Sequence, residues 1–249
     1  ANKDKFECYG TYVESQLEME GVKAIRMDLR KRDETILLLN AIEPEIIIFA
    51  AKVDNEGEII GYLVEEIKKM KCRLIYMSSD AVFDGNKGEY KEEDSPNPTE
   101  GYGRGKADSE KIIQAGLKDY AIIRASYIYG ANSRGYGMMI KGLLESIRSG
   151  KPFPAYANVY KSPTFVDDLV EHAMKVAESD YRGIIHIAGE RMSVYEFNKK
   201  VAEMISINGS IVKMEMAGQQ SDTSLDSSKA KKLFGFAASP VEDCIAELD

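Results

Sequence analysis

The sequence predicts an α/β protein built on a doubly wound parallel sheet, with a smaller lobe formed by the C-terminal part of the chain. Apolar segments of strand length alternate with segments whose apolar residues recur at helical spacing, which is typical of βαβ units. Residues 45–51 are a continuous apolar run, as expected of a strand buried on both faces of a parallel sheet. Such sheets bind ligands at the carboxyl ends of their strands, where the strand order reverses.

The predicted elements follow one another at the lengths that this fold requires. Strands are expected at residues 6–13, 24–29, 45–51, 73–78, 120–124 and 183–187. Helices are expected at residues 32–42, 62–70, 102–115, 138–149, 166–178 and 193–204. The stretch 80–101 is rich in Gly, Pro, Asn and Asp and is predicted to be a long loop.

Two domains are expected. We assign residues 1–130 to a dinucleotide-binding domain and residues 131–249 mainly to a substrate-binding lobe, with some segments returning to the sheet. A dinucleotide fold opens with a strand and a Gly-x-x-Gly-x-x-Gly turn that cradles the pyrophosphate. That turn is absent here, and residues 6–13 resemble a second strand without a first one. We therefore expect the first strand and its turn to precede residue 1 in the complete protein.

Composition excludes several classes of function. A formal net charge of −8 argues against a sequence-independent grip on nucleic acid. No apolar run is long enough to span a bilayer, and the polar first residues do not resemble a signal peptide. The widely separated Cys8, Cys72 and Cys244 predict free thiols in a reducing cytoplasm. His172 and His186 are isolated, so no metal site is expected.

A serine, a tyrosine and a lysine are predicted to meet at the end of the fourth strand. Ser79 lies at the carboxyl end of that strand, and Tyr102 and Lys106 lie one turn apart on one face of the following helix. Reduction of a ketone requires a proton donor, and a tyrosine can serve if its pKa falls from about 10 toward neutrality. A lysine ammonium beside the phenol would lower its pKa, and a serine hydroxyl would orient the carbonyl oxygen.

The spacing alone is weak evidence. With 14 tyrosines in a lysine-rich chain, about one Tyr-x-x-x-Lys pattern is expected by chance. A second one occurs at Tyr195 and Lys199, in a predicted amphipathic helix without a serine-rich strand end before it. We interpret that second pair as structural and Tyr102 with Lys106 as catalytic.

Longer motifs around these residues resemble those of the dTDP-4-dehydrorhamnose reductases, a family of extended short-chain dehydrogenases. The block Ser78-Ser-Asp-Ala-Val-Phe-Asp-Gly85 and the segment Tyr102-Gly-Arg-Gly-Lys106 carry the resemblance. Further matching segments are residues 90–96, 124–130, 162–169, 183–189 and, more weakly, 224–228. The resemblance implies a Rossmann-like fold and reduction of the 4-keto group of a nucleotide-activated deoxysugar, with dTDP-4-dehydrorhamnose as the family's substrate.

The resemblance also implies roles for individual residues. Tyr102 would donate the proton, Lys106 would lower its pKa and hold the nicotinamide ribose, and Ser79 would orient the keto oxygen. The implied cofactor-binding residues are Asp28, Leu29, Ala50, Ala51, Ser78, Tyr102 and Lys106. The implied substrate-binding residues are Ser79, Asp80 and Tyr127. The family favours NADP, whereas Glu14 after the first predicted strand favours NAD.

Alternative functions remain open at this point. Ala81 replaces a tyrosine common in the family, and Gly105 replaces a serine. A dehydratase would carry a second carboxylate directly after Asp80, which this chain lacks, whereas an epimerase would recycle its own NAD. The non-catalytic β subunit of methionine adenosyltransferase is similar to the same reductases, so a regulatory subunit is a further alternative. A homodimer is compatible with each of these functions.

Overall fold

The main sheet consists of four parallel strands. The computed structural model describes residues 5–14, 19–132, 135–204, 211–217 and 221–246 of the chain. Within them the strand order is β12–β5–β4–β3, formed by β3 (Ile46–Phe49), β4 (Arg73–Ser79), β5 (Tyr120–Ala125) and β12 (Gly183–His186). Every pairing is parallel, and helical crossovers connect successive strands. The predicted doubly wound α/β fold is confirmed.

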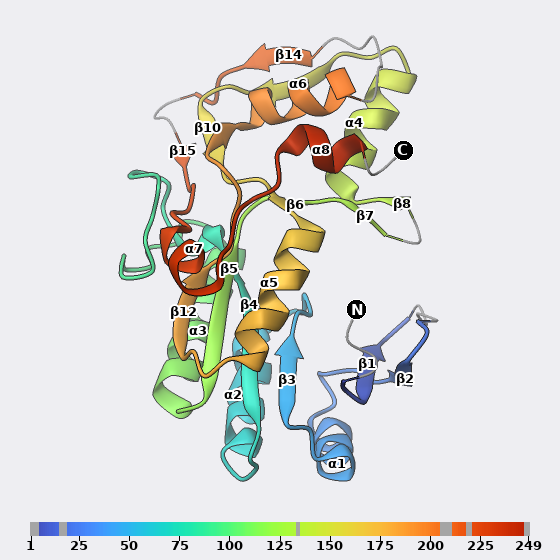
Figure 1. Cartoon of the computed structure of the whole chain (residues 1–249), viewed down its shortest axis with the longest axis vertical. Coiled ribbons are helices and arrows are strands. Elements are labelled where there is room, and N and C mark those ends of the chain that lie inside the picture. Colours follow the sequence, from blue (N-terminus) through green and yellow to red (C-terminus); the bar gives the residue numbers. More distant parts are fainter. Residues whose placement is uncertain (1–4, 15–18, 133–134, 205–210, 218–220, 247–249) are drawn as a thin grey trace.

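Helices cover both faces of this sheet (Figure 1). On one face, α2 (Glu56–Ile67) and α3 (Gly101–Gly116) enclose an apolar cluster in which Ile60 and Ile67 lie with Leu74 of β4. On the other face, α5 (Val166–Glu178) and α7 (Ser228–Phe234) pack with β5 and β12. The apolar residues of α2 and α5 recur every three or four positions, and this spacing gives each helix one stripe to bury.

The N-terminal strands form a separate unit. β1 (Cys8–Tyr12) and β2 (Val22–Arg26) pair in parallel, and α1 (Arg32–Ile42) leads from them to β3. Among the described residues, no strand joins this pair to the main sheet, so β3 forms its edge. The prediction that this strand is buried on both faces is wrong for the described chain. Ile48 of this edge strand is 44% exposed.

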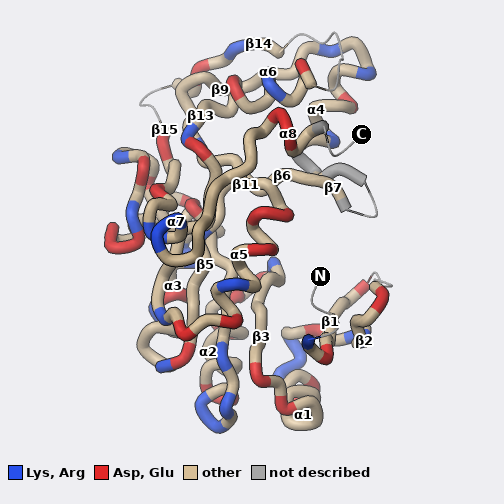
Figure 2. The backbone as a smooth tube through the Cα atoms, viewed as in Figure 1, with Lys and Arg blue, Asp and Glu red and all other residues tan. Residues whose placement is uncertain are grey.

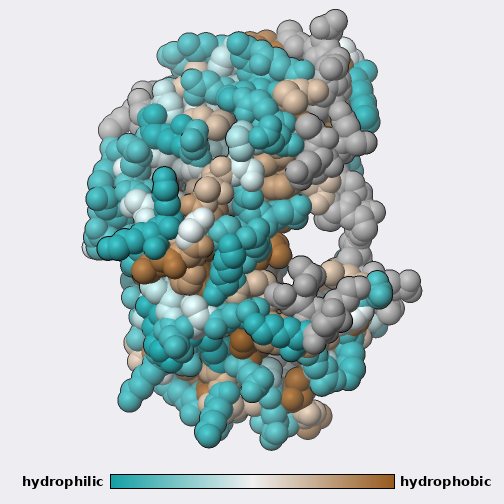
Figure 3. Space-filling model, in the orientation of Figure 1, coloured by the Kyte–Doolittle hydropathy of each residue, from teal (hydrophilic) through white to brown (hydrophobic). Residues whose placement is uncertain are grey.

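A smaller lobe lies above the sheet (Figure 1). Its helices are α4 (Met138–Arg148), α6 (Val194–Met204) and α8 (Val241–Ala246), with β9 (Phe153–Tyr156) and β14 (Ile211–Met214) paired beside them. These elements share one apolar cluster that includes Leu143 and Phe197. The molecule is hollowed between this lobe and the β1–β2 unit (Figure 3). A domain boundary at residue 130 stays a prediction.

Short strands connect the lobe to the sheet. They are β6 (Ile128–Tyr129) with β11 (Thr164–Phe165), β7 (Ala131–Asn132) with β8 (Gly135–Tyr136), and β10 (Val159–Lys161) between β13 (Met192–Ser193) and β15 (Ser221–Asp222). These strands and the pair β9–β14 were not predicted. Runs of two to four residues carry too little periodicity to be recognised in a sequence.

A buried ion pair joins α3 to the sheet. Arg124 of β5 donates two hydrogen bonds to Glu110 of α3, at 2.9 Å to Oε1 and 2.6 Å to Oε2. The hydroxyl of Ser78 donates to the same carboxylate at 2.6 Å. His186 of β12 lies beside the guanidinium, and burial lowers its pKa to about 3, so its ring is neutral at physiological pH. The pair therefore contains one positive and one negative charge, both inaccessible to water.

Removing one member of this pair should destabilise the fold strongly. Glu110→Ala leaves the Arg124 guanidinium buried without a counter-charge, which should lower the free energy of unfolding by about 3–5 kcal/mol. Urea denaturation followed by circular dichroism measures the loss. Glu145→Ala on α4 is the control, because its ion pair with Lys141 is solvent-exposed and should contribute less than about 1 kcal/mol. Equal losses in both variants would contradict this account of the buried pair.

Candidate active site

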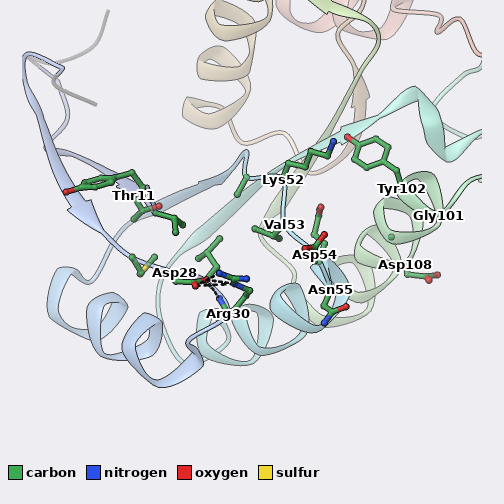
Figure 4. A pocket seen from close by; sticks show the side chains of 18 residues that line it. Thr11, Asp28, Arg30, Lys52, Val53, Asp54, Asn55, Gly101, Tyr102 and Asp108 are labelled. Atoms are coloured by element: carbon green, nitrogen blue, oxygen red, sulfur yellow. Dashed lines mark hydrogen bonds and ion pairs between the residues drawn. The ribbon is translucent and has the colours of Figure 1, made fainter. Parts of the chain in front are cut away.

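A cavity of about 850 Å³ opens at the carboxyl ends of β1, β2 and β3. Thr11 and Tyr12 line it from β1, residues 27–30 from the segment after β2, and residues 51–57 from the segment after β3. The start of α3 closes it, with Tyr102 at the rim (Figure 4). This is the edge of a doubly wound sheet at which ligands bind.

The close packing of Gly103 on the turn after β4 places Tyr102 against the end of that strand. A Cβ atom at Gly103 would lie 1.9 Å from the carbonyl oxygen of Ala81, so only glycine lets α3 begin this close to the turn η1 (Asp80–Val82). The backbone N–H of Ala81 in turn donates to the hydroxyl oxygen of Ser79 at 3.2 Å. The spacing of Tyr102 and Ser79 is therefore fixed by backbone packing of the helix on the turn.

Lys106 lies one helical turn beyond Tyr102, as the spacing of four predicts. Its side chain is buried, and its ammonium donates to Oε1 of Glu56 at 2.8 Å and to the carbonyl oxygen of Met77 at 2.9 Å. The ammonium nitrogen is 5.8 Å from the centre of the Tyr102 ring. Ser79, Tyr102 and Lys106 are thus brought together beside the cavity.

The pKa of the Tyr102 phenol differs from the sequence-based expectation. Burial raises the pKa of the Tyr102 phenol and the Glu56 carboxylate raises it further, while a hydrogen bond with Ser79 opposes both effects. Lys106 does not lower the pKa of Tyr102 in this structure, contrary to the prediction. The physical reason is that the Lys106 ammonium is paired with Glu56, so the two charges largely cancel at the phenol.

All three predicted substrate residues, Ser79, Asp80 and Tyr127, lie outside the lining of this cavity. The carboxylate of Asp80 accepts hydrogen bonds from Lys161 at 2.8 Å and from Thr223 at 2.5 Å, so it joins the sheet to the β10–β15 region. Tyr127 has a positive φ of 46°, and its ring packs edge-on against Phe197 of the lobe. Substrate contacts by these side chains stay a prediction.

The predicted cofactor residues divide into two groups. The cavity is lined by Asp28, Leu29, Ala51 and Tyr102. Its lining does not include Ala50, Ser78 or Lys106. The side chain of Ser78 is directed to Glu110 instead. Arg30 donates to both carboxylate oxygens of Asp28, and these hydrogen bonds lower the pKa of Asp28 to about 2 (Figure 4). Asp28 is therefore a carboxylate throughout the physiological range.

The sequence analysis missed five charged residues of the cavity lining, which are Arg30, Lys52, Asp54, Glu56 and Asp108. Arg30 and Lys52 line the cavity, and Figure 4 shows the amino end of Lys52 directed to the hydroxyl of Tyr102. Lys52 follows Ala51 at a strand end, so the rule that identified Ser79 could have identified it as well. Glu56 has no such signal, because the predicted helix 62–70 did not include its position.

Other ligand classes find little support in the described residues. Lysines and arginines are interspersed with acidic residues along the chain (Figure 2). Within the described ranges, no group of three His, Cys, Asp or Glu residues is placed to hold a metal ion. In the same part of the chain, no helix has the length and apolar character needed to cross a membrane.

Comparisons with known proteins agree with this arrangement. The chain is 26% identical over 247 residues to the dTDP-4-dehydrorhamnose reductase of Aggregatibacter actinomycetemcomitans, covering 86% of this chain and 83% of that protein. It is 30% identical over 157 residues to the methionine adenosyltransferase 2 subunit beta of Bos taurus, covering 60% of this chain and 47% of that protein.

A crystal structure of a hypothetical dTDP-4-dehydrorhamnose reductase from Sulfolobus tokodaii has a TM-score of 0.82 and 29% identity, covering 96% of this chain and 91% of that one. The Bacillus anthracis reductase in complex with NADP has a TM-score of 0.83 at 20% identity and 97% coverage of both chains, which shows the shared fold. The model of the RmlD substrate binding domain matches residues 50–248. From the strand-end serine, the Tyr102–Lys106 helix and this match over most of the chain, we conclude that the protein belongs to the RmlD family, as the motifs predicted.

Proposed function

We propose that this protein is a reductase that reduces the 4-keto group of a nucleotide-activated deoxysugar with NAD(P)H, and that its substrate is dTDP-4-dehydrorhamnose. One observation carries the proposal. Tyr102 lies at the rim of a cavity at the carboxyl edge of a doubly wound sheet, with Ser79 and Lys106 beside it. The reductase of A. actinomycetemcomitans, which matches most of this chain, supports the choice of substrate.

The side chains can perform the proton chemistry of a ketone reduction. NAD(P)H, when bound, supplies the hydride for the carbonyl carbon. The Tyr102 hydroxyl, half exposed at the rim, donates its proton to the carbonyl oxygen as negative charge develops there. Ser79 donates a hydrogen bond to the same oxygen and holds it in line with the phenol. Lys106 is held between Glu56 and the Met77 carbonyl, so its ammonium is fixed beneath Tyr102.

The cavity fits part of a dinucleotide. Asp28 and Leu29 border one end and Tyr102 borders the other, so an extended cofactor can reach from the β2 end to the catalytic residues. A glycine-rich pyrophosphate cradle is not among the lining residues. NADP is the proposed cofactor and NAD the alternative, in keeping with the B. anthracis structure that contains NADP and a Bordetella bronchiseptica structure, WbmH, that contains NAD⁺.

Replacing Tyr102 should separate catalysis from binding. Tyr102→Phe removes the proton donor but keeps the ring, so kcat for the NADPH-dependent reduction of dTDP-4-dehydrorhamnose should fall about 100-fold or more. The loss of absorbance of the reduced nicotinamide reports turnover, and the net consumption of NADPH excludes an epimerase. Cofactor affinity should stay nearly constant. Tyr195→Phe, at the other Tyr-x-x-x-Lys pattern, should retain activity, and unchanged turnover in Tyr102→Phe would sink the assignment.

Arg30 should contribute to the choice of cofactor. It is the arginine in the cavity lining, and an arginine near the adenosine ribose accommodates the 2′-phosphate of NADP. We expect NADPH to bind more tightly than NADH, and Arg30→Ala to weaken NADPH about tenfold with little effect on NADH. Calorimetric titration measures both affinities. Arg32→Ala is the control, because its guanidinium pairs with Glu65 and is not in the lining. Equal weakening of both cofactors would contradict a phosphate contact.

A regulatory subunit is the second candidate function. It is favoured by the 30% identity to the bovine adenosyltransferase subunit, although the match spans about half of that protein's length. On this hypothesis the cavity binds a dinucleotide without turnover. A purified methionine adenosyltransferase catalytic subunit should then co-elute with this protein in gel filtration. The protein should consume no NADPH when it is assayed with a panel of nucleotide-activated 4-keto sugars. NADPH consumption without co-elution would exclude this function.

A further inference from the structure

The ion pair beneath Tyr102 is closed off from water. Glu56 begins α2 and is 7% exposed, and Lys106 is 4% exposed. The Oε1 atom of Glu56 accepts hydrogen bonds from both the Lys106 ammonium and the Tyr76 hydroxyl. Three elements, α2, α3 and β4, therefore supply one compact polar group in an otherwise apolar cluster. Burial of such a pair is costly unless every member has its partner.

Glu56 is the main charge acting on Lys106, because the other nearby charged groups are paired elsewhere or exposed to solvent. The titratable and charged side chains near the pair are Tyr76 on β4, Glu110 on α3, Lys52 after β3, and Asp80 in η1. Burial raises the pKa of Tyr76, so this phenol remains neutral and only donates its hydrogen bond. Glu110 is occupied by Arg124, and Asp80 is occupied by Lys161. Lys52 is exposed, where solvent screens its charge.

A reduction requires Tyr102 to hold its proton until the carbonyl oxygen takes it. A lone ammonium beneath the phenol would favour the phenolate and release that proton early. Glu56 opposes this tendency while still holding the ammonium in place. We propose that Glu56 is a positioning residue that fixes Lys106 beneath Tyr102 and offsets its charge, which keeps the Tyr102 hydroxyl protonated over a wider pH range. Its benefit for turnover rests on the proposed reductase function.

Titration of Tyr102 in the protein tests the proposal without any substrate. Glu56→Gln keeps an oxygen acceptor for Lys106 but removes the negative charge, so the pKa of Tyr102 should fall by about one unit. Tyrosine labelled with ¹³C at Cζ reports each phenol by NMR, and Tyr102→Phe identifies the signal of Tyr102. Glu66→Gln is the matched control, since Glu66 is a buried glutamate on the same helix that pairs with Lys69. This control should leave the titration unchanged.

A double variant distinguishes charge from shape. In Glu56→Gln/Lys106→Met both charges are removed, so Tyr102 should titrate again close to its value in the unmodified protein. An unchanged pKa in Glu56→Gln, or a shift of the same size in Glu66→Gln, overturns the proposal. So does a double variant that titrates like Glu56→Gln, because the effect would then not depend on Lys106.

Kinetics then separate this proposal from the proposed function. Proton donation is lost as the pH rises through the pKa of Tyr102, so the alkaline limb of kcat in Glu56→Gln should move to lower pH by the same amount. KM should change little, because glutamine keeps the size of the side chain and an oxygen that accepts from Lys106. If the protein reduces no sugar but the pKa of Tyr102 falls in Glu56→Gln, the proposed reductase function is refuted and the proposed role of Glu56 stands. A normal reductase without that shift would refute the role of Glu56 alone.

Discussion

The buried pair of Lys106 and Glu56 is the constraint on which the site depends. Its two charges come from different helices and meet beneath a strand end, so α2, α3 and β4 must keep their relative positions for either charge to remain paired. A buried charge without its partner is strongly unfavourable. Any rearrangement of the three elements that separates the pair therefore costs free energy. Helix α3 is therefore held by electrostatics on its inner face as well as by apolar packing.

A second constraint acts on the N-terminal end of α3. Gly103 allows the first turn of α3 to touch the Ala81 carbonyl, which holds Tyr102 next to the end of β4. The Arg124–Glu110 pair fixes the helix again one turn beyond Lys106. Three successive turns of α3 are thus held in place, by a backbone contact with η1, by the ion pair with α2 and by the ion pair with β5. The phenol at its exposed end can be presented to a ligand with little freedom to move.

The cavity lies at the edge of the main sheet. β1 and β2 form their own pair and β3 ends the sheet, so the cavity lies between two separate parallel units within the described residues. In the proposed function, the adenosine end of a dinucleotide would lie at the segment after β2, and the reactive end at the segment after β3 and at α3. The surface that remains between them is where a glycine-rich turn is expected from the fold class.

Much of this protein could be predicted from its residue pattern. The boundaries of α1 and α5 were predicted to the residue, because amphipathic periodicity and polar flanks mark helices locally. The place of Ser79, Tyr102 and Lys106 also followed from local rules, since a strand end and a helical spacing of four depend on nearby residues. By contrast, α2 begins earlier than predicted, at Glu56, where Asn55 has a positive φ and the apolar stripe has not yet begun.

By itself, the sequence determined the order of the elements, the family and the residues that meet at the carboxyl edge of the sheet. The charge state around Tyr102 was decided only by the tertiary structure, because Glu56 and Lys106 lie 50 positions apart along the chain. The same holds for Asp80 and Ser78, whose side chains are bound by Lys161, Thr223 and Glu110 from distant segments. Sequence spacing predicts which face a side chain occupies, whereas its electrostatic partners depend on how distant elements pack.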